Sequence, residues 1–547
     1  MSFFAQATDR FLGTQSNDPT APTMIEMLLA ASKMQDLLKG QSLRTSMRVA
    51  VMAGSMAKRM ALPVRDVHAV VYAAMVYDLG LATIAADVYT CLPAHINEKR
   101  VFSIHGFLNT RGLPNARLIA ALEGTGGIDT PAASPTAEHK ATSPTPEKNP
   151  HPIESALNAL TPMLSSLGSL SLSDLDSGLR ESPPKVEAHS EAPLRESGKD
   201  LPVRVTDPMA SRAANLPNIL ARHPLALSDF CHKAGLSSDV KAVIEAHHEL
   251  CDGSGYPYGL TRHDIPMGAR ILCLADAIEG VLAEHDRSKN HLVSRQQALE
   301  NFLAVRTLDK FETEAVAVFK EILEDYPDFM KLIAGREVET MCRNLVSERE
   351  EPLSGGRVLA FAEALASLVD NITPLYRQDH SKKVADTALK MAERLGINKA
   401  QAGELLLAAL LHDIGMIDVP VSILLKQGSL SEAEWKIVKE HPHWTQEILK
   451  HIPSFANVVL WAAEHHERLN GRGYPLAKKG VEISTGGRVI ALADVFDALT
   501  SPRPYRTHVF EPMDALPIIG QSRYTQFDNH LVSLLRTAVL ETELVVK

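Results

Sequence analysis

Histidines and aspartates that could hold metal ions recur in the C-terminal part of this sequence. The candidate ligands are His380, His412, Asp413, His441, His465, His466 and Asp494. Imidazole nitrogens and carboxylate oxygens together suit iron, manganese or zinc. Two ions about 3.5–4 Å apart can hold a hydroxide and the oxygens of a phosphate diester. Asp413 directly follows His412 and is well placed to bridge two ions. We therefore expect a dinuclear centre that contains both residues.

The elements that position these ligands are expected to be helices. Apolar residues recur every three or four positions through most of the chain, and strand-like alternation is scarce. His380 shares one predicted helix face with Val384, Ala388, Met391, Ala392 and Leu395. Residues 405–411 are apolar on all sides, which is typical of a fully buried helix. The sequence therefore predicts an all-α fold.

The ligand-bearing region repeats an earlier part of the chain. Residues 45–80 align with residues 380–415 at an offset of 335, and His247-His248-Glu249 aligns with His465-His466-Glu467 at an offset of 218. The first copy thus carries 117 additional residues, where Pro, Ser, Thr, Glu and Lys predominate and predict disorder. We expect two tandem helical domains, with boundaries as follows: a leader over 1–23, a first copy over 24–353 with a disordered insert at about 116–212, and a second copy over 357–547.

Composition narrows the class of protein. The chain has 547 residues, a net charge of -10 and five scattered cysteines, which do not form a disulfide framework. The acidic balance disfavours nucleic acid as a partner. The N-terminus does not resemble a signal peptide, and no apolar run approaches the roughly 18 residues of a membrane span. We expect a cytoplasmic protein that binds neither nucleic acid nor membranes.

The second copy resembles the HD-GYP subgroup of the HD-domain metal-dependent phosphohydrolases. The motifs that carry the resemblance are His412-Asp413, His465-His466-Glu467, Gly473-Tyr474-Pro475 and the run from Ala493 to Arg506. The resemblance implies an all-helical core and a di-iron or di-manganese site. It also implies hydrolysis of the bacterial messenger cyclic di-GMP to linear pGpG or GMP, with the first copy as a regulator.

The same resemblance assigns roles to individual residues. Asp413 would be shared by both ions, with His412 among the ligands of the first, and Lys426, Arg503 and Arg506 would contact the substrate. The alternative for the two arginines is a surface ion pair, and for Lys426 a solvated loop. The two expected ligand sets are His380, His412, Asp413 and Asp494 for one ion, and Asp413, His441, His465 and His466 for the other.

Two departures from the family pattern bear on activity. Met416 stands where the family usually has a lysine that can approach the substrate phosphate, which implies attenuated or lost turnover. Tyr376 stands where some members have a glutamate for a third metal, so we expect two ions. The alternatives to a cyclic di-GMP phosphodiesterase are a catalytically inactive cyclic-dinucleotide receptor or protein-interaction scaffold, and a phosphohydrolase for another cyclic dinucleotide or nucleotide.

The first copy has lost part of the ligand set. Thr45 and Tyr77 stand at the positions of His380 and His412, and His285 and Ser288 replace the two arginines. Either His223 or His105 could correspond to His441, and we favour His223. The residues retained are Asp78, His247, His248 and Asp276. We expect a packing or dimerisation module, or a site that binds a nucleotide or a single metal without turnover. A homodimer and a signalling-protein partner both remain open.

Overall fold

The fold is all-α, as predicted. The computed structural model describes residues 20–41, 44–92, 102, 216–287, 294–304, 309–347, 350–372, 378–503, 508–521 and 525–546. Within these ranges the regular elements are all helices, joined by loops with isolated β-bridges. The predicted disordered insert, His105, Tyr376 and Arg506 lie outside the described residues. The domain boundaries given above remain predictions.

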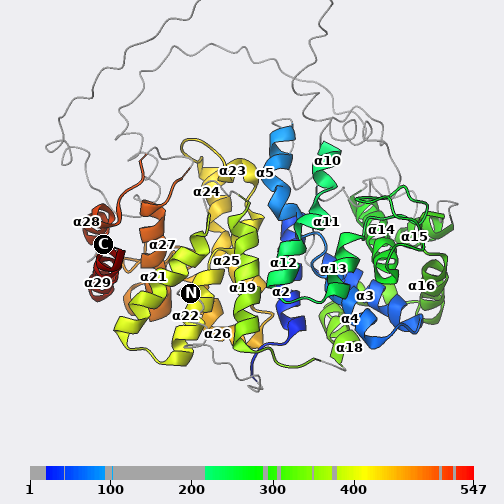
Figure 1. The fold of residues 1–547 in the computed structure, drawn as a ribbon, viewed down its shortest axis with the longest axis horizontal. Coiled ribbons are helices and arrows are strands. Elements are labelled where there is room, and N and C mark those ends of the chain that lie inside the picture. The colour runs from blue at the N-terminus through cyan, green and yellow to red at the C-terminus, as the bar shows by residue number, and fades with distance from the viewer. Residues whose placement is uncertain are drawn as a thin grey trace, which may run out of the picture.

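The N-terminal half, defined here as residues 20–353, occupies one end of an elongated molecule (Figure 1). Its helices are α2 (Met24–Leu38), α3 (Thr45–Arg59), α4 (Val64–Ala74), α5 (Leu81–Cys91), α10 (Leu216–Leu220), α11 (His223–Ala226), α12 (Ser228–Lys233), α13 (Ser238–Glu245), α14 (Met267–Arg287), α15 (Arg295–Ala304), α16 (Thr313–Asp325), α17 (Phe329–Ala334) and α18 (Val338–Val346).

The C-terminal half, residues 354–546, occupies the other end, drawn in yellow to red in Figure 1. Its helices are α19 (Gly355–Asp370), α21 (His380–Leu395), α22 (Lys399–Leu411), α23 (Val421–Leu424), α24 (Glu432–Lys439), α25 (His441–Leu449), α26 (Ala456–Ala463), α27 (Thr485–Thr500), α28 (Pro512–Gln521) and α29 (Asn529–Val546). Three short 3₁₀ helices accompany them, η5 (Ile414–Asp418), η6 (Pro453–Phe455) and η7 (Gly480–Glu482).

Local sequence explains the two helices that carry the first ligands. Helix α21 buries the face predicted from its periodicity, and it ends at Gly396, whose positive φ of 67° suits a residue without a Cβ. Helix α22 begins at Asn398, whose side chain accepts a hydrogen bond from the backbone N–H of Gln401 at 2.9 Å. Its run from Leu405 to Leu411 is buried, which confirms the prediction of a core helix.

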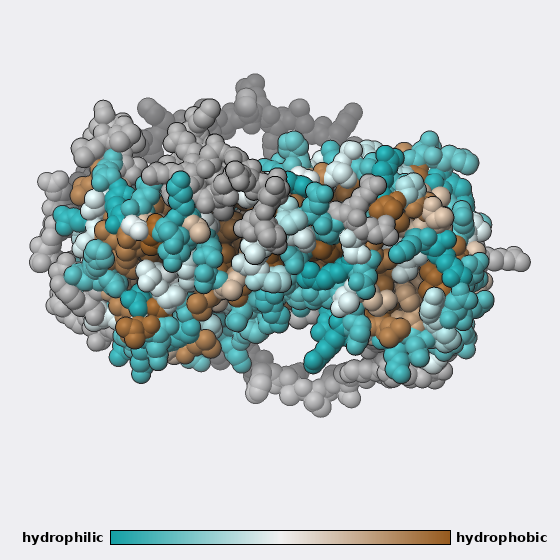
Figure 2. All heavy atoms as spheres, turned by 90° about the horizontal axis from the view of Figure 1, so that it is seen from below, coloured by the Kyte–Doolittle hydropathy of each residue, from teal (hydrophilic) through white to brown (hydrophobic). Residues whose placement is uncertain are grey.

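One segment, Lys399–Asp418, is long and apolar enough to cross a membrane by length and composition alone. The fold buries 83% of its most apolar window, as is usual for the core helix of a globular domain. On the face of the molecule in Figure 2, hydrophobic side chains lie in patches separated by hydrophilic ones. The apolar character of Lys399–Asp418 is therefore explained by packing inside the fold.

The two halves pack against each other through helices from both. Helix α2 packs on α3 of its own half and on α25 and η5 of the C-terminal half. In the other direction, α19 packs against α5 and α12, and these helices meet near the centre of Figure 1. Helix α2 is buried on nearly every side, including its polar residues Ser32, Lys33, Gln35 and Asp36. A single hydrophobic core consequently runs through both halves.

An ion pair ties α18 to the end of α25 across this contact. Glu339 lies 3.0 Å from Nδ1 of His451 and 3.1 Å from Arg343. The hydrogen bond from His451 is the main reason that the pKa of Glu339 falls to about 2 from its ordinary value of 4.5. A carboxylate with a lowered pKa stabilises the fold above its unfolded pKa, and that stabilisation is lost as pH falls from about 4.5 toward 2.

We expect Glu339→Gln to lower the free energy of unfolding by about 1–2 kcal/mol at pH 7, a value discounted because the side chain is partly solvated. The loss should shrink below about pH 4.5, because the carboxylate of the unfolded chain then takes up a proton while the folded one, with its pKa of about 2, is still ionised. Chemical denaturation at pH 7 and pH 3 measures both differences. Equal losses at the two pH values would contradict this account, and Glu314→Gln, on the exposed side of α16, serves as the control.

Candidate metal centres

The seven predicted ligands come together in the C-terminal half, and we call them the C-terminal cluster. His380 begins α21, His412 and Asp413 join α22 to η5, and His441 begins α25. His465 and His466 follow α26, and Asp494 lies within α27. Helix ends and tight junctions thus supply nearly all of the ligands. All but His466 are buried, and His466 is partly exposed.

The two carboxylate oxygens of Asp413 face different pairs of histidines. Oδ2 lies 3.5 Å from Nε2 of His380 and 3.6 Å from Nε2 of His412. Oδ1 lies 3.2 Å from Nε2 of His441 and 3.5 Å from Nε2 of His465. The two histidines that face each oxygen belong to the same one of the two expected ligand sets. Asp413 therefore has the orientation that a bridging carboxylate requires.

Hydrogen bonds fix which nitrogen of each ring faces the carboxylate. Nδ1 donates to a backbone carbonyl in His412 (Ala409, 2.8 Å), His441 (Val438, 2.7 Å) and His465 (Ala462, 2.6 Å). A neutral imidazole that donates through Nδ1 carries a lone pair on Nε2. Several lone pairs and an anion therefore face one another, and Nε2 of His412 is buried without a hydrogen bond in the described part of the chain. Such a donor set fits divalent cations.

Burial keeps these rings in the form that binds metal. It lowers the pKa of His412 to about 4 and the pKa of His466 well below its ordinary value, and neighbouring histidines lower the latter further. Both rings are therefore neutral near pH 7. The ring of His466 lies 4.0 Å from that of His465 and 5.0 Å from that of His441, and Asp494 lies 3.6 Å from His380. The last two ligands thus adjoin the two sides of Asp413.

Asp497, to which the sequence analysis gave no role, lies against His380 in the structure. Its carboxylate accepts a 2.6 Å hydrogen bond from Nδ1 of His380 and so directs Nε2 toward Asp413 and Asp494. Burial by itself raises the pKa of Asp497, but the His380 hydrogen bond and nearby positive charges outweigh it and lower the pKa to about 2. The spacing of three residues from Asp494 on one helix was the available signal, because such residues share a face.

We expect Asp497→Asn to weaken metal binding about 10–100-fold, as is usual when a group that orients a ligating histidine is altered. Titration of the metal-free protein with Mn²⁺ measures the change. Asp386→Asn is a matched control on the same helix as His380, because the one ion pair of Asp386 among the described residues is with Lys390 on the partly exposed side of α21. Asp386→Asn should bind Mn²⁺ with wild-type affinity. If Asp497→Asn did so too, Asp497 would not be needed to orient the ring of His380, and this prediction would be wrong.

The Gly-Tyr-Pro loop packs against the neighbouring ligands His465 and His466. The N–H of Tyr474 donates to the carbonyl of His466 at 3.1 Å, and the two rings lie 4.6 Å apart. Glu467 accepts hydrogen bonds from the backbone N–H groups of Leu476 at 2.7 Å and Lys478 at 2.9 Å. A Cβ on Gly473 would lie 2.5 Å from the carbonyl oxygen of His466, so only glycine permits this approach. These contacts of the motif hold the backbone of the two histidine ligands in place.

The predicted substrate contacts lie outside the ring of metal ligands. Lys426 pairs with Glu434 at 2.7 Å on a half-exposed loop. Arg503 is partly buried and lies 3.5 Å from Asp497, which in turn contacts His380. Arg506 is outside the described residues. Their contact with a substrate remains a prediction.

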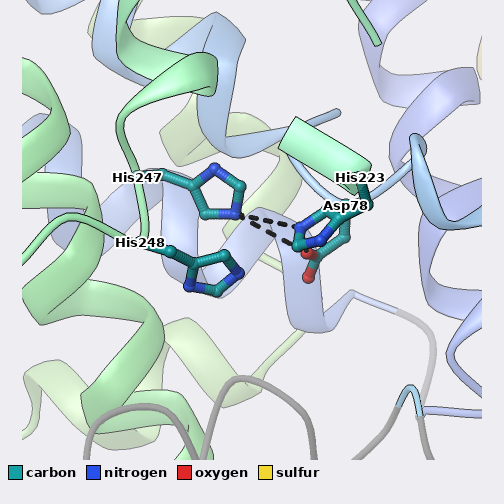
Figure 3. Close-up of side chains that lie close together, drawn as sticks. All are labelled: Asp78, His223, His247 and His248. Carbon is teal, nitrogen blue, oxygen red and sulfur yellow. Dashed lines mark hydrogen bonds and ion pairs between the residues drawn. The ribbon is translucent and has the colours of Figure 1, made fainter. Parts of the chain in front are cut away.

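A second cluster lies in the N-terminal half, where Figure 3 draws its side chains. This N-terminal cluster comprises Asp78, His223, His247 and His248. One possible ligand atom from each residue lies within 4.8 Å of those of the others. Asp78 joins α4 to α5, and His223 begins α11, as Asp413 and His441 do in the C-terminal half. The distance between the rings of His223 and His247 is 5.3 Å, as it is between His441 and His465. The arrangement of one side of the C-terminal cluster is thus repeated in this part of the chain.

Comparison with known proteins identifies the family. The HD domain model matches residues 213–311 and 318–531, more than half of the chain, which therefore belongs to the HD domain family. The Gly-Tyr-Pro motif beside His465 and His466 is that of the HD-GYP subgroup.

The curated relatives are phosphodiesterases of cyclic dinucleotides. The chain is 33% identical over 314 residues to 3′3′-cGAMP-specific phosphodiesterase 3 of Vibrio cholerae, which covers 57% of this chain and 65% of that protein. It is 34% identical over 229 residues to a cyclic di-GMP phosphodiesterase response regulator of Xanthomonas campestris. That match covers 38% of this chain and 60% of that protein. The chain thus spans less than two thirds of the length of these relatives.

A solved structure shares the fold along nearly the whole chain. It is the crystal structure of a cyclic GMP-AMP-specific phosphodiesterase of Vibrio cholerae, with a TM-score of 0.53 and 20% sequence identity. The superposition covers 95% of this chain and 98% of that one. At this identity the likeness establishes the fold.

Proposed function

We propose that the C-terminal cluster holds two divalent ions, iron or manganese, and hydrolyses cyclic di-GMP, giving linear pGpG when one phosphodiester bond is cleaved or GMP when both are. The observation that carries the proposal is the orientation of Asp413, whose two oxygens each face a separate pair of imidazole nitrogens at 3.2–3.6 Å. Two bound ions would supply Lewis-acid activation of the diester and of a water molecule. The names of the relatives support a cyclic dinucleotide as the substrate class.

The protein side chains contribute position and charge. The backbone carbonyls of Ala409, Val438 and Ala462 fix three rings in one tautomer, and Asp497 fixes a fourth, so that the ligands are preorganised. Arg503 would approach a substrate phosphate after exchanging its contact with Asp497. Helix α2 packs on η5, directly after Asp413, which supports regulation of the C-terminal cluster by the N-terminal half.

Specific observations favour two other functions. The cGAMP-specific relative matches more of the chain than the cyclic di-GMP relative does, which favours 3′3′-cGAMP as the substrate. Met416, in place of the family lysine, favours a receptor that binds a cyclic dinucleotide without turnover. Its side chain is buried in η5, where it brings no charge to the centre.

The test is hydrolysis by the full chain. The protein is purified anaerobically, its iron and manganese are quantified, and it is incubated separately with cyclic di-GMP and 3′3′-cGAMP. Linear product that disappears in His412→Ala supports the proposal, and the better substrate decides between the two messengers. A metal-loaded protein that binds either nucleotide but releases no product is the receptor instead. In that case Met416→Lys tests whether the missing cation accounts for the loss.

A further inference from the structure

The N-terminal cluster repeats one side of the C-terminal cluster in detail. Oδ1 of Asp78 lies 3.1 Å from Nε2 of His223 and 3.7 Å from Nε2 of His247 (Figure 3). Nδ1 of His223 donates to the carbonyl of Leu220 at 2.8 Å, and Nδ1 of His247 to that of Ile244 at 2.6 Å. The Nε2 lone pairs therefore face a carboxylate oxygen, as those of His441 and His465 do.

The other side of Asp78 has a cation in place of histidines. The ammonium of Lys39 lies 2.5 Å from Oδ2, and both side chains are about 5% exposed. Oδ2 is the counterpart of the Asp413 oxygen that faces His380 and His412. Asp78 consequently has one oxygen directed at imidazoles and the other neutralised by an amino group of the protein.

The neighbouring carboxylates on the Lys39 side also have protein partners. The hydroxyl of Tyr77, at the position of His412, donates to Asp276, the counterpart of Asp494. Glu279, the counterpart of Asp497, pairs with Arg48, which also donates to Thr45 at 3.1 Å. Each carboxylate left by the lost histidines thus has a fixed donor or positive charge. That pattern is a coherent replacement of one metal position by side chains.

We propose that the N-terminal cluster binds a single divalent first-row metal ion through Asp78, His223, His247 and His248, while the Lys39 ammonium stands in for the second ion. Three imidazoles and one carboxylate suit Zn²⁺, Fe²⁺, Mn²⁺ or Co²⁺. A site with one ion lacks the second ion that a bridging nucleophile requires, so it binds metal without hydrolysis. Lys39 directly follows α2, so Asp78 connects this ion position to the end of the helix that packs against η5.

Metal counting on the full chain tests the proposal with Mn²⁺ as the probe. The wild type is expected to bind three ions, Asp413→Ala only one because Asp413 is shared by both C-terminal ions, and His247→Ala with His248→Ala two. Electron paramagnetic resonance should show an isolated six-line Mn²⁺ signal for the chain that retains only the N-terminal cluster. The chain that retains only the C-terminal cluster should show a spin-coupled pair. Absence of hydrolysis alongside these counts would contradict the proposed function and leave this inference intact.

Substitutions at Lys39 test the second element of the proposal. In the Asp413→Ala background, Lys39→Arg keeps the positive charge and should keep the count at one. Lys39→Ala combined with Thr45→His and Tyr77→His should raise it to two. Circular dichroism establishes folding, and His412→Ala with His465→Ala, one ligand from each side of Asp413, replaces the background if Asp413→Ala does not fold. No ion in a folded background, or two ions with Lys39 intact, would overturn the proposal.

Discussion

Asp413→Ala is expected to reduce cyclic-dinucleotide hydrolysis at least about a thousand-fold and to release metal from the C-terminal half. Asp413 supplies one oxygen to each side of the cluster, so its loss affects both ion positions at once. Removal of a histidine would alter only one side. Single-turnover assays and metal analysis of the same preparation measure the two effects together.

Glu404→Ala is the matched control for Asp413→Ala. Glu404 lies on α22, the helix that leads to His412, but in the described part of the chain its carboxylate accepts hydrogen bonds from Asn457 alone, at 3.0–3.1 Å and on the surface. This variant should retain full activity and metal content. Turnover within tenfold of wild type in Asp413→Ala would show that the carboxylate does not bridge the ions, and the proposed centre would then be wrong.

Gly415→Ala is expected to lower the free energy of unfolding by about 3 kcal/mol or more and to disrupt the centre. A Cβ at residue 415 would lie 2.0 Å from the carbonyl oxygen of His441 and 2.6 Å from the amide nitrogen of Thr445. Both are backbone atoms, so η5 must move away from α25. Thr445 also joins the two segments, because its hydroxyl donates to the carbonyl of His412 at 2.9 Å. Any shift therefore displaces Asp413 relative to His441.

Gly520→Ala provides the control for glycine replacement, because a Cβ there meets nothing within 4 Å. Thermal unfolding and metal content should be close to wild type in that variant. Gly80→Ala should destabilise the N-terminal half in the same way as Gly415→Ala does the C-terminal half, since its Cβ would lie 2.1 Å from the carbonyl oxygen of His223. A Gly415→Ala protein with wild-type stability would contradict this reading of the close approach.

Much of the C-terminal cluster could be predicted because its ligands stand in short, recognisable motifs. The helical period predicted the buried face of α21, and the apolar run from Leu405 to Leu411 predicted a core helix. The division of the ligands between the two oxygens of Asp413 agrees with the sets that the family resemblance implied. These features depend on local spacing, which a sequence displays directly.

Features that depend on contacts between distant segments escaped prediction. Lys39 lies before the aligned repeat, and its partner Asp78 is 39 residues away, so no periodicity connects them. The apolar composition of α2 indicates burial but does not specify which helices cover it. Arg503 could be recognised as a conspicuous cation, but its contact with Asp497 depends on how the chain turns after α27.

The burial of α2 between the halves has a practical consequence for dissecting the protein. The glycine-rich joint at Ser354-Gly355-Gly356 looks like a natural place to cut, yet a fragment starting there would leave α25 and η5 without the helix that covers them. Newly exposed apolar surface favours aggregation. The activity or metal content of such a fragment would therefore reflect the loss of α2 as well as the loss of the rest of the N-terminal half. The contribution of each half is better separated by point substitutions within an intact polypeptide.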